Sequence, residues 1–377
     1  MEPGPLSTDP LLQDSAEDPE GLLGAVLRTA GSSGAAPLFP GGPTLVTTLA
    51  DSRTVLTHPV DFELPYDVSR RRIRRAEGPR RATPPLSPAT VAVGRQVFVD
   101  ELTAAEPSFD GPELDTLVFL REPVARSTTA ALVPEADIAV RDQIAGLVLA
   151  WIDALAPVIG AARSPRPWTR TRRTEQRAHR ALLDTLAGLD CDDAPARATT
   201  LAAGIQVPIA AGAWCLTQLA RRPDLRRRLH DDPDAVLPYV WEILRLYPPT
   251  WLLPRISTRE YVLGGVPIPA YTPLLVSPVA LGRLPDLVPG PSSGCSPLDE
   301  LDPERWSHEA YRPGAWLPFG AGPHACPGRN LGLAQLTHLV SWASDFELVV
   351  SVEPAVDTSR GLSPDPSAIV VQRGADA

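Results

Sequence analysis

The sequence predicts a mainly α-helical protein with small β-sheets (α+β). The segment Ala198–Ala220 carries no charge along its whole length but is only weakly hydrophobic, which favours a buried core helix over a membrane span. Ser87–Leu102 and Glu135–Ile159 show the apolar spacing of amphipathic helices. Short β-type segments follow in the C-terminal half, at Trp251–Ile256, Tyr261–Leu263 and Leu274–Ser277.

The other elements follow from local signals. Asp193 and Pro195 predict the start of the long apolar helix, and Pro248 ends the helix expected over Asp234–Tyr247. We also expect a strand at Leu45–Leu49, a short helix at Arg53–Leu56, a basic helix at Thr171–Ala187 ended by Gly188, a hairpin turn at Gly264-Gly265, loops over Leu287–Leu301 and Phe319–Gly328, and a final helix over Arg329–Ala343. Residues 1–36 are expected to be loosely ordered, and 37–377 to form a single domain.

Bulk composition narrows the class of protein. Of 377 residues 44% are hydrophobic and 21% are charged, as in soluble globular proteins, and the net charge of −10 argues against nucleic acid as a partner. Two basic runs, Ser69–Arg81 and Arg163–Arg180, depart from this balance and are either solvated faces or docking surfaces.

The N-terminus has no basic residue before Arg28, so we expect neither a signal peptide nor a membrane anchor. Cys191, Cys215, Cys295 and Cys326 show no CxxC spacing, which indicates a reducing, cytoplasmic location.

One cysteine stands in a distinctive setting, Phe319-Gly320-Ala321-Gly322-Pro323-His324-Ala325-Cys326-Pro327-Gly328. Glycines on both sides allow the backbone to fold tightly around the sulfur. The helix predicted directly after the loop places the positive end of its dipole near a thiolate. A thiolate stabilised in this way can ligate iron. The alternative for Cys326 is a buried free cysteine in a Gly-rich loop.

Two further motifs precede that loop. Glu242-Ile243-Leu244-Arg245 puts an acid and a base three residues apart on one helix face, and Pro303-Glu304-Arg305-Trp306 follows on a loop. Alone, the first is compatible with a surface ion pair. The order E-x-x-R, P-E-R-W and F-x-x-G-x-x-x-C-x-G resembles the cytochrome P450 superfamily, in its short bacterial form, specifically from about Ala198 to Gly332.

The resemblance implies a cytochrome P450 fold, with heme b (iron protoporphyrin IX) between a long distal helix and a proximal cysteine loop. It implies that Cys326 is the axial ligand of the iron and that Glu242, Arg245 and Arg305 form a buried structural network. It further implies cofactor-binding roles for His324, Arg255, Arg81 (or Arg80), Phe319, Gly322 and Gly328. The implied partners are a small-molecule substrate and a ferredoxin with its reductase, and the implied state is a monomer.

The chain departs from the family on the distal helix. Typical members carry A-G-x-(Asp/Glu)-Thr, whereas this chain has Ala203-Gly204-Ile205-Gln206-Val207, placed 242 − 207 = 35 residues before Glu242. Gln206 therefore stands at the catalytic acid position and Val207 at the alcohol position, and neither supplies a titrating proton. Pro208 is expected to kink the helix. Only 194 − 160 = 34 residues separate the helix ending at Ile159 from the long helix, so we expect an abbreviated lid with a single helix.

Several functions remain open at this point. The first is monooxygenation, by hydroxylation or epoxidation, with protons from water or substrate. The second is oxidative coupling, cyclisation, rearrangement or nitrene-type transfer. A peroxide-driven peroxygenase is disfavoured because Ala198–Ala220 lacks arginine, and a non-enzymatic heme sensor is a remote alternative. The expected substrate is an apolar or aromatic small molecule of bacterial secondary metabolism, in a pocket lined by Ala203, Gly204, Val207, Trp251, Leu252 and Leu253.

Overall fold

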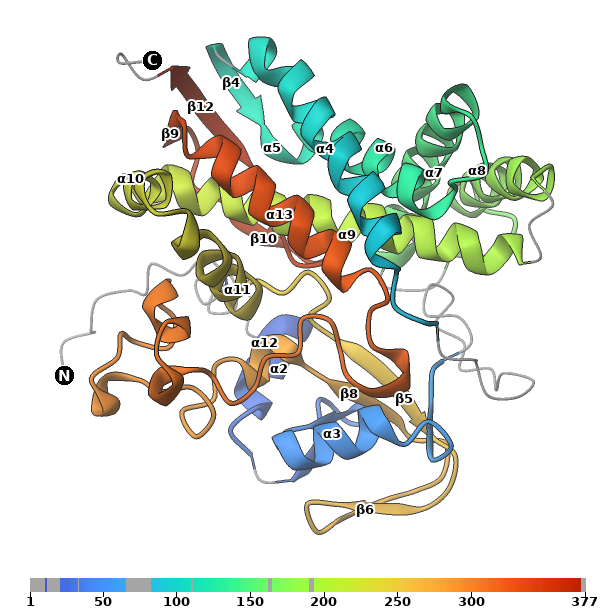
Figure 1. The fold of residues 1–377 in the computed structure, drawn as a ribbon. Coiled ribbons are helices and arrows are strands. Elements are labelled where there is room, and N and C mark those ends of the chain that lie inside the picture. The colour runs from blue at the N-terminus through green and yellow to red at the C-terminus, as the bar shows by residue number, and fades with distance from the viewer. Residues whose placement is uncertain are drawn as a thin grey trace. The chain divides into compact units, whose positions relative to one another are not determined.

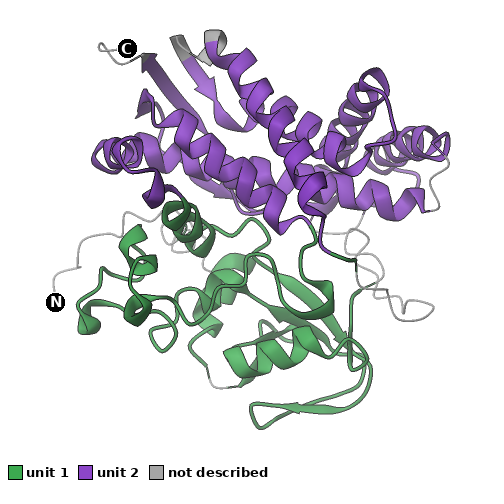
Figure 2. Ribbon diagram, in the orientation of Figure 1, with its two compact units in different colours: residues 1–68, 72–84, 237–327 green, residues 69–71, 85–236, 328–377 purple. Residues whose placement is uncertain are grey.

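The structure is a computed structural model that describes residues 11, 21–32, 34–65, 83–109, 111–161, 165–189 and 193–373. The chain divides into two compact units (Figure 2). Unit 1 comprises residues 1–68, 72–84 and 237–327, and unit 2 comprises residues 69–71, 85–236 and 328–377. Arg81, Cys191 and the basic run at 70–81 lie outside the described residues. The single domain over 37–377 and the loose order of residues 1–36 stay predictions.

Unit 1 is built on a five-stranded sheet in the order β1-β2-β8-β5-β3. Its strands are β1 (Ala35–Pro37), β2 (Thr44–Val46), β3 (Phe62–Glu63), β5 (Leu253–Ser257) and β8 (Pro273–Val276). All pairs are antiparallel except β2 with β8, which is parallel, so the N-terminal segment joins a sheet whose central strands come from the C-terminal half. The strands expected near residues 45, 251 and 274 are thus present with slightly shifted ends.

Helices and a hairpin complete unit 1. They are α2 (Leu22–Thr29), α3 (Leu49–Thr57), most of α11 (Val236–Leu246), α12 (Pro278–Leu281), and the hairpin β6 (Tyr261–Leu263) with β7 (Val266–Ile268). The hairpin turns at Gly264 and Gly265, whose φ angles of +54° and +80° suit glycine, as predicted. Thr48 caps α3 by accepting from the amide of Asp51. Val55, Leu56 and Phe62 pack with strand residues Val46 and Leu274 in a fully buried apolar core.

Unit 2 is a helical bundle around the long helix α9 (Ala194–Arg221). The helices around it are α4 (Pro88–Phe109), α5 (Thr116–Phe119), α6 (Arg121–Leu132), α7 (Ile138–Ile159), α8 (Arg170–Ala187), α10 (Pro223–Asp231) and α13 (Arg329–Ala343). Figure 1 shows α13 lying along α9, and α6, α7 and α8 also pack against it. Two small sheets, β4-β12-β9 and β10-β11, use β4 (Gly111–Asp115), β9 (Phe346–Val350), β10 (Ala355–Asp357), β11 (Ser363–Asp365) and β12 (Ala368–Arg373).

Helix α9 forms as its sequence predicts. The Asp193 carboxylate accepts from the amide of Ala196, and Pro195 occupies the first turn. The helix continues through Pro208 without interruption. Every residue from Ile209 to Ala220 is buried. Helices α7 and α9 are long and apolar enough to cross a membrane by length and composition, a test that a buried core helix also passes, and 67% of the α9 window is buried.

Helix α6 was not predicted, because its buried face is made of small and polar residues rather than a large apolar stripe. Ser127 donates to the carbonyl of Gly94 on α4 at 2.7 Å and accepts from the Gln335 side chain on α13 at 2.8 Å. Hydrogen bonds therefore replace part of the apolar packing at this junction. Helix α7 begins at Ile138, three residues after the predicted start, because Asp137 caps it through the amide of Val140.

The region between α7 and α9 contains one helix in its described part, residues 165–189. This helix is α8, which starts at the Thr169 cap and ends at Gly188. The sequence predicted an abbreviated lid with a single helix in this region, and the described residues agree with that prediction.

Candidate functional site

The loop that carries Cys326 is closed by backbone hydrogen bonds within unit 1. The Cys326 amide donates to the carbonyl of Phe319 at 2.9 Å, and the Ala325 amide donates to that of Gly322 at 3.0 Å. A short 3₁₀ turn, Gly322–His324, lies between them. Cys326 is exposed and is not part of a disulfide, and α13 starts three residues along the chain. The thiol is therefore presented at the surface of unit 1 by a fixed loop, with a helix N-terminus next in sequence.

Gly322 is required by two features of this loop. Its φ of +71° lies in the left-handed region, and a Cβ atom there would stand 2.5 Å from the carbonyl oxygen of Leu56. Gly320, also left-handed at φ +66°, faces Leu253 of β5. The loop is thus seated against the C-terminal end of α3 and beside the central sheet. A side chain at position 322 cannot be accommodated without moving backbone.

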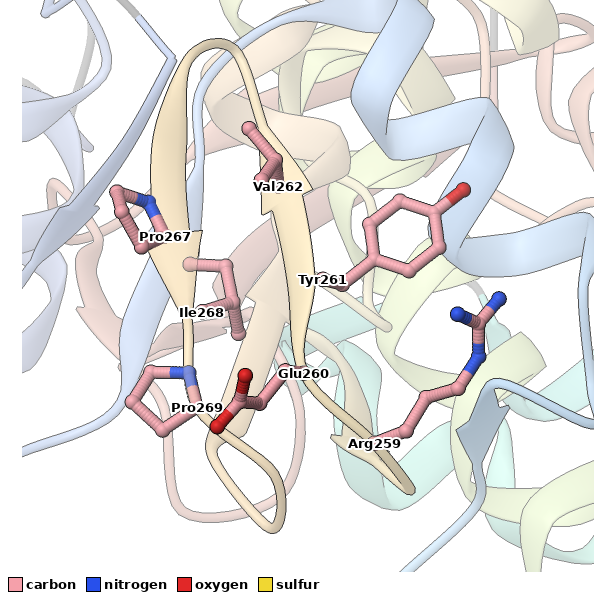
Figure 3. A pocket seen from close by; sticks show the side chains of 7 residues that line it. All are labelled: Arg259, Glu260, Tyr261, Val262, Pro267, Ile268 and Pro269. Carbon is pink, nitrogen blue, oxygen red and sulfur yellow. The ribbon is translucent and has the colours of Figure 1, made fainter.

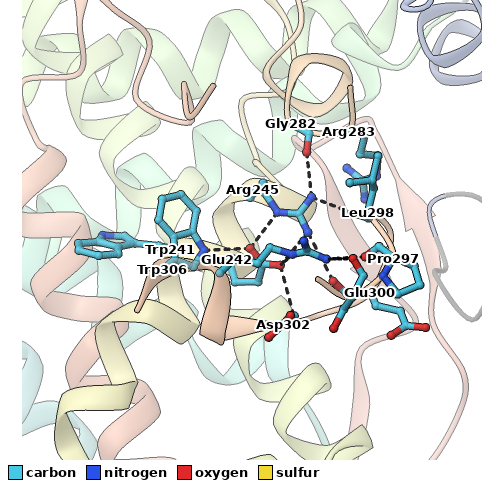
Figure 4. Close-up of polar contacts among 12 residues, drawn as sticks. Trp241, Glu242, Arg245, Gly282, Arg283, Pro297, Leu298, Glu300, Asp302 and Trp306 are labelled. Carbon is cyan, nitrogen blue, oxygen red and sulfur yellow. Dashed lines mark hydrogen bonds and ion pairs between the residues drawn. The ribbon is translucent and has the colours of Figure 1, made fainter. Parts of the chain in front are cut away.

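A buried ion cluster lies in the same unit (Figure 4). Glu242 on α11 accepts from Arg245 at 2.7 and 2.8 Å and from Arg305 at 3.3 Å, and all three side chains are fully buried. The remaining donors of Arg245 reach the carbonyl oxygens of Gly282 and Leu298, and those of Arg305 reach Pro289, Ser296 and Pro297. The structure therefore brings together the three residues of the predicted network, and carbonyl dipoles absorb the extra positive charge.

Three tryptophans connect this cluster with the cysteine loop. The Trp306 indole donates to Glu242 at 2.9 Å, and its ring centroid lies 5.8 Å from that of Trp316. Trp316 in turn contacts the ring of Phe319 edge-on at 5.7 Å and donates to the carbonyl of Trp241 at 3.1 Å. Sequence reasoning did not assign roles to Trp241 or Trp316. In the sequence, Trp316 is visible only as an aromatic residue just before the Cys326 motif, and Trp241 only as the residue before Glu242.

Arg255 on β5 is a buried cation with no acidic partner among the described residues. It is 4% exposed, its Nη1 donates to the carbonyl of Pro254 at 2.8 Å, and its Nε has no hydrogen-bond partner. It forms no ion pair with a described residue, and burial lowers its pKa to about 10. A buried guanidinium in this state has the charge and the donors that suit a carboxylate. This is the role that the resemblance assigned to Arg255.

The residues of unit 1 fit an iron porphyrin. An exposed thiol in a hydrogen-bonded loop suits iron ligation, and a buried arginine with no ion pair to a described residue suits a propionate. The left-handed Gly322 lets the loop approach the Leu56 carbonyl closely. His324, in the 3₁₀ turn, is half-buried. Phe319 packs on Trp316, and Gly328 precedes α13 as its N-cap. The donor set is therefore that of a heme-thiolate site.

The other predicted residues lie as follows. Trp251 is buried, whereas Leu252 and Leu253 are half-buried around the start of β5. On α9 in unit 2, Ala203 is exposed and Val207 is half-buried. Gly204 packs on α6, where its carbonyl accepts from Thr128 at 3.1 Å and a Cβ would stand 3.0 Å from the Thr128 methyl.

The Gln206 side chain is held by a contact that the sequence did not suggest. Its Nε2 donates to the carbonyl of Arg360 at 2.9 Å, in the loop between β10 and β11. Two turns further along α9, the Trp214 indole donates to the carbonyl of Leu362 at 3.1 Å. The Gln206 amide thus links α9 to the loop between β10 and β11. This structural contact differs from the proton transfer expected of an acid at this position.

A separate hollow of about 610 Å³ lies on the β6–β7 hairpin (Figure 3). Its lining residues are Arg259, Glu260, Tyr261, Val262, Pro267, Ile268 and Pro269, none of which was a predicted site residue. The Arg259 guanidinium lies over the Tyr261 ring and pairs with Asp61 at 2.8 Å, holding the pKa of that carboxyl below its usual range. Among the described residues, no group of three or more His, Cys, Asp or Glu side chains that could hold a metal ion gathers there.

The fold is mainly helical, and the Cys326 loop has features that suit a heme-thiolate site. A family model described as Cytochrome P450 matches residues 195–361. The solved structure of CYP175A1 from Thermus thermophilus is similar to this chain, with a TM-score of 0.74 and 22% sequence identity over 97% of each chain. The solved structure of EryK from S. erythraea has a TM-score of 0.70 and 20% identity, and the match covers 95% of this chain and 96% of the other. Residues 195–361 are thus similar to the cytochrome P450 family, and the chain has the fold of solved cytochrome P450 structures.

The curated relatives include two oxygenases of Streptomyces species. A cyclooctat-9-en-7-ol 5-monooxygenase of Streptomyces melanosporofaciens is 33% identical over 203 residues, 46% of this chain and 42% of the relative. A pentalenene oxygenase of Streptomyces avermitilis is 29% identical over 184 residues, 42% of this chain and 38% of the relative. The chain thus spans less than half the length of these relatives.

Proposed function

We propose that the chain is a heme b-dependent oxidoreductase that oxidises an apolar small molecule. The observation that carries the proposal is that unit 1 contains both the exposed Cys326 thiol and the buried Arg255, which forms no ion pair with a described residue. One group supplies a ligand for iron and the other a partner for a carboxylate. Iron protoporphyrin IX presents both a metal and carboxylates, so a single cofactor satisfies both.

The roles of the chain's own residues follow from this arrangement. Cys326 would hold the iron as a thiolate, Arg255 and His324 would bind propionates, and Phe319 would pack against the porphyrin. When bound, the heme supplies the redox chemistry that activates oxygen. The ion cluster of Glu242, Arg245 and Arg305 would hold the loop segments around the ligand in place.

Reduction in the presence of carbon monoxide tests the proposal. The wild-type protein should give the red-shifted Soret band of a thiolate-ligated heme. Cys326→Ser should retain its fold, measured by circular dichroism, but lose that band. Cys295→Ser, at a half-buried cysteine outside the loop, is the matched control and should keep it. A thiolate-type band in Cys326→Ser would refute the assignment.

Monooxygenation is the reaction that the relatives favour. It consumes dioxygen, two electrons and two protons, inserts one oxygen atom into the substrate by hydroxylation or epoxidation, and releases the other as water. The residues proposed to contact the substrate carry no polar side-chain atom except the Trp251 indole nitrogen. They are Ala203, Gly204 and Val207 of α9 in unit 2, and Trp251, Leu252 and Leu253 in unit 1. The two Streptomyces relatives named above support an apolar substrate in bacterial secondary metabolism.

A second candidate reaction is favoured by the Gln206 contact. Because the Gln206 amide is engaged with the Arg360 carbonyl and Val207 has no polar atom, neither can relay a proton. Oxidative coupling, cyclisation, rearrangement or nitrene-type transfer needs fewer or differently timed protons. Peroxide-driven oxidation and heme sensing without catalysis remain the less favoured alternatives.

We further propose a ferredoxin with its reductase as the electron source, a monomeric state and a cytoplasmic location. The proposed ferredoxin surface includes Arg71 and Arg72, which lie outside the described residues. Electrostatic docking weakens as salt rises. Reduction by ferredoxin should therefore slow with added salt and slow again in Arg71→Glu with Arg72→Glu. Reduction that is independent of salt would count against docking there.

A further inference from the structure

Helix α8 carries a row of arginines that the proposed chemistry does not use. Arg170, Arg173, Arg177 and Arg180 are all exposed, and their spacing of three, four and three residues places them on one helix face. At a rise of about 1.5 Å per residue the row is about 15 Å long. We call these four residues the α8 arginine row.

The row has no internal counter-charge. None of the four side chains forms an ion pair with a described residue, although arginines on neighbouring elements do, such as Arg121 with Asp153 and Arg197 with Glu135. Like charges three and four residues apart destabilise a helix, and positive charge in the first turn opposes the helix dipole. The row therefore costs helix stability, and on this face of α8 Asp184, four residues after Arg180, offsets that cost at one end of the row only.

The opposite face of α8 holds the helix rigidly. Arg172 pairs with Glu175 at 3.1 Å with both side chains buried, and the Trp151 indole of α7 donates to Glu175 at 3.2 Å. Trp151 also stacks on His179, with ring centroids 4.3 Å apart. Leu182 and Leu186 continue the buried face. The row is thus presented on a fixed helix, which lowers the entropy cost of binding a partner.

We propose that the α8 arginine row is a docking surface for an acidic protein that presents a row of carboxylates. Forked guanidinium groups match carboxylates geometrically. Next to the row, Trp168 is 62% exposed, with the Arg166 guanidinium 5.4 Å from its ring centre. Tryptophan and arginine are the residues most enriched at the centres of protein interfaces.

An anionic membrane is the weaker alternative. The apolar face of α8 is already buried, which leaves Trp168 as the large apolar side chain beside the row. A bilayer would also meet a broad face of a molecule with net charge −10. An acidic protein needs to approach the row alone, and charges beyond about 8 Å are screened at physiological salt.

The probe is a fluorescein-labelled helical peptide with four glutamates at the spacing of the row. Fluorescence anisotropy should show binding to the holoprotein that weakens with added salt. Arg173→Glu with Arg177→Glu should raise Kd about tenfold or more, since two exposed ion pairs become repulsions. The neutral pair Arg173→Gln with Arg177→Gln should fall between that variant and the wild type.

The matched control reverses two exposed arginines elsewhere, Arg53→Glu on α3 with Arg227→Glu on α10, and should change Kd less than about twofold. Equal weakening by the control would show only an effect of net charge and would overturn the proposal. So would equal binding of a peptide with glutamines in place of glutamates. Row-dependent binding to phosphatidylglycerol vesicles without peptide binding would assign the surface to lipid instead. Circular dichroism verifies that each variant is folded.

Discussion

The indole nitrogen of Trp306 donates to a carboxylate oxygen of Glu242 at 2.9 Å, and this bond joins the buried ion cluster to the aromatic chain that reaches the Cys326 loop. Glu242 also accepts from two arginines and from the amide of Asp302. A fully buried carboxylate has lost its contacts with water, so it depends on each of these hydrogen-bond donors for its stability. Trp306 thus couples the charge balance of the cluster to the position of Phe319.

Trp306→Phe should reveal this coupling. An aromatic ring is kept, although a smaller one, but the donor is lost, so the free energy of unfolding should fall by at least about 1–3 kcal/mol. Urea titration measures that loss. Trp316→Phe is the matched control because it removes a bond to a backbone carbonyl and should cost only about 0.5–1.5 kcal/mol. An equal fall in the free energy of unfolding in both variants would mean that the hydrogen bond to Glu242 stabilises the protein no more than the bond to a backbone carbonyl does.

Glu242→Ala should be more severe than any single donor loss. It leaves Arg245 and Arg305 buried without a counter-charge, and breaking a buried ion pair on one side costs about 3–5 kcal/mol. We expect little protein with bound heme, measured by heme absorbance per chain and by Tm. Wild-type heme content and Tm in Glu242→Ala would show that the cluster is dispensable.

Gly322→Ala should disrupt the cysteine loop specifically. A left-handed residue with a side chain costs about 1–2 kcal/mol, and at position 322 the added Cβ also meets the Leu56 carbonyl. Gly265→Ala is the control, because Gly265 has a similar φ of +80° with open space around it. Both variants should lose stability, but only Gly322→Ala should lose heme retention. Similar heme affinity in the two would exclude a packing role for Gly322.

Arg255→Met should have opposite effects on the protein without and with heme. Removing a buried cation that lacks a counter-charge should raise the Tm of the heme-free protein, while heme affinity should fall about tenfold or more. A fall in both quantities would indicate that Arg255 is stabilised by contacts other than heme.

The pH dependence of the heme-free protein follows from the same residue. Burial lowers the pKa of Arg255 to about 10 in the folded state, so above that pH the unfolded chain binds more protons. Stability relative to Arg255→Met should therefore be lowest and constant below pH 10 and should improve as pH rises through it. Unfolding titrations at several pH values check this, and a difference that does not change with pH would contradict it.

Gln206→Asp with Val207→Thr tests the proton supply. The substitution restores an acid and an alcohol but removes the amide that donates to Arg360, so it should not speed the natural reaction if no side-chain relay is used. By-products or peroxide are expected to increase instead. A rise in coupling between electrons consumed and product formed, with an unchanged product, would favour a water-relay monooxygenase. Repeating the comparison with Pro208→Ala removes the effect of the proline.

Short-range features of this protein were determined by its sequence. The Asp193 cap, the Gly264-Gly265 turn, the helix from Arg329 to Ala343 and the shared helix face of Glu242 and Arg245 all depend on residues within one or two turns of each other. Their geometry follows from backbone sterics and helix periodicity alone. The prediction of small β-sheets and a single helix between α7 and α9 rested on the same local signals.

Long-range contacts were decided only by the tertiary structure. Arg305 meets Glu242 across 63 residues, and Gln206 meets the Arg360 carbonyl across 154. The first pairing could be anticipated from a resemblance, but no periodicity predicts it. The second could not, because a glutamine on an apolar helix has no local partner and its donor goes wherever packing presents an acceptor. The buried Ser127 of α6 and the missing counter-charge of Arg255 were likewise invisible in the sequence, since burial is a property of the packed chain.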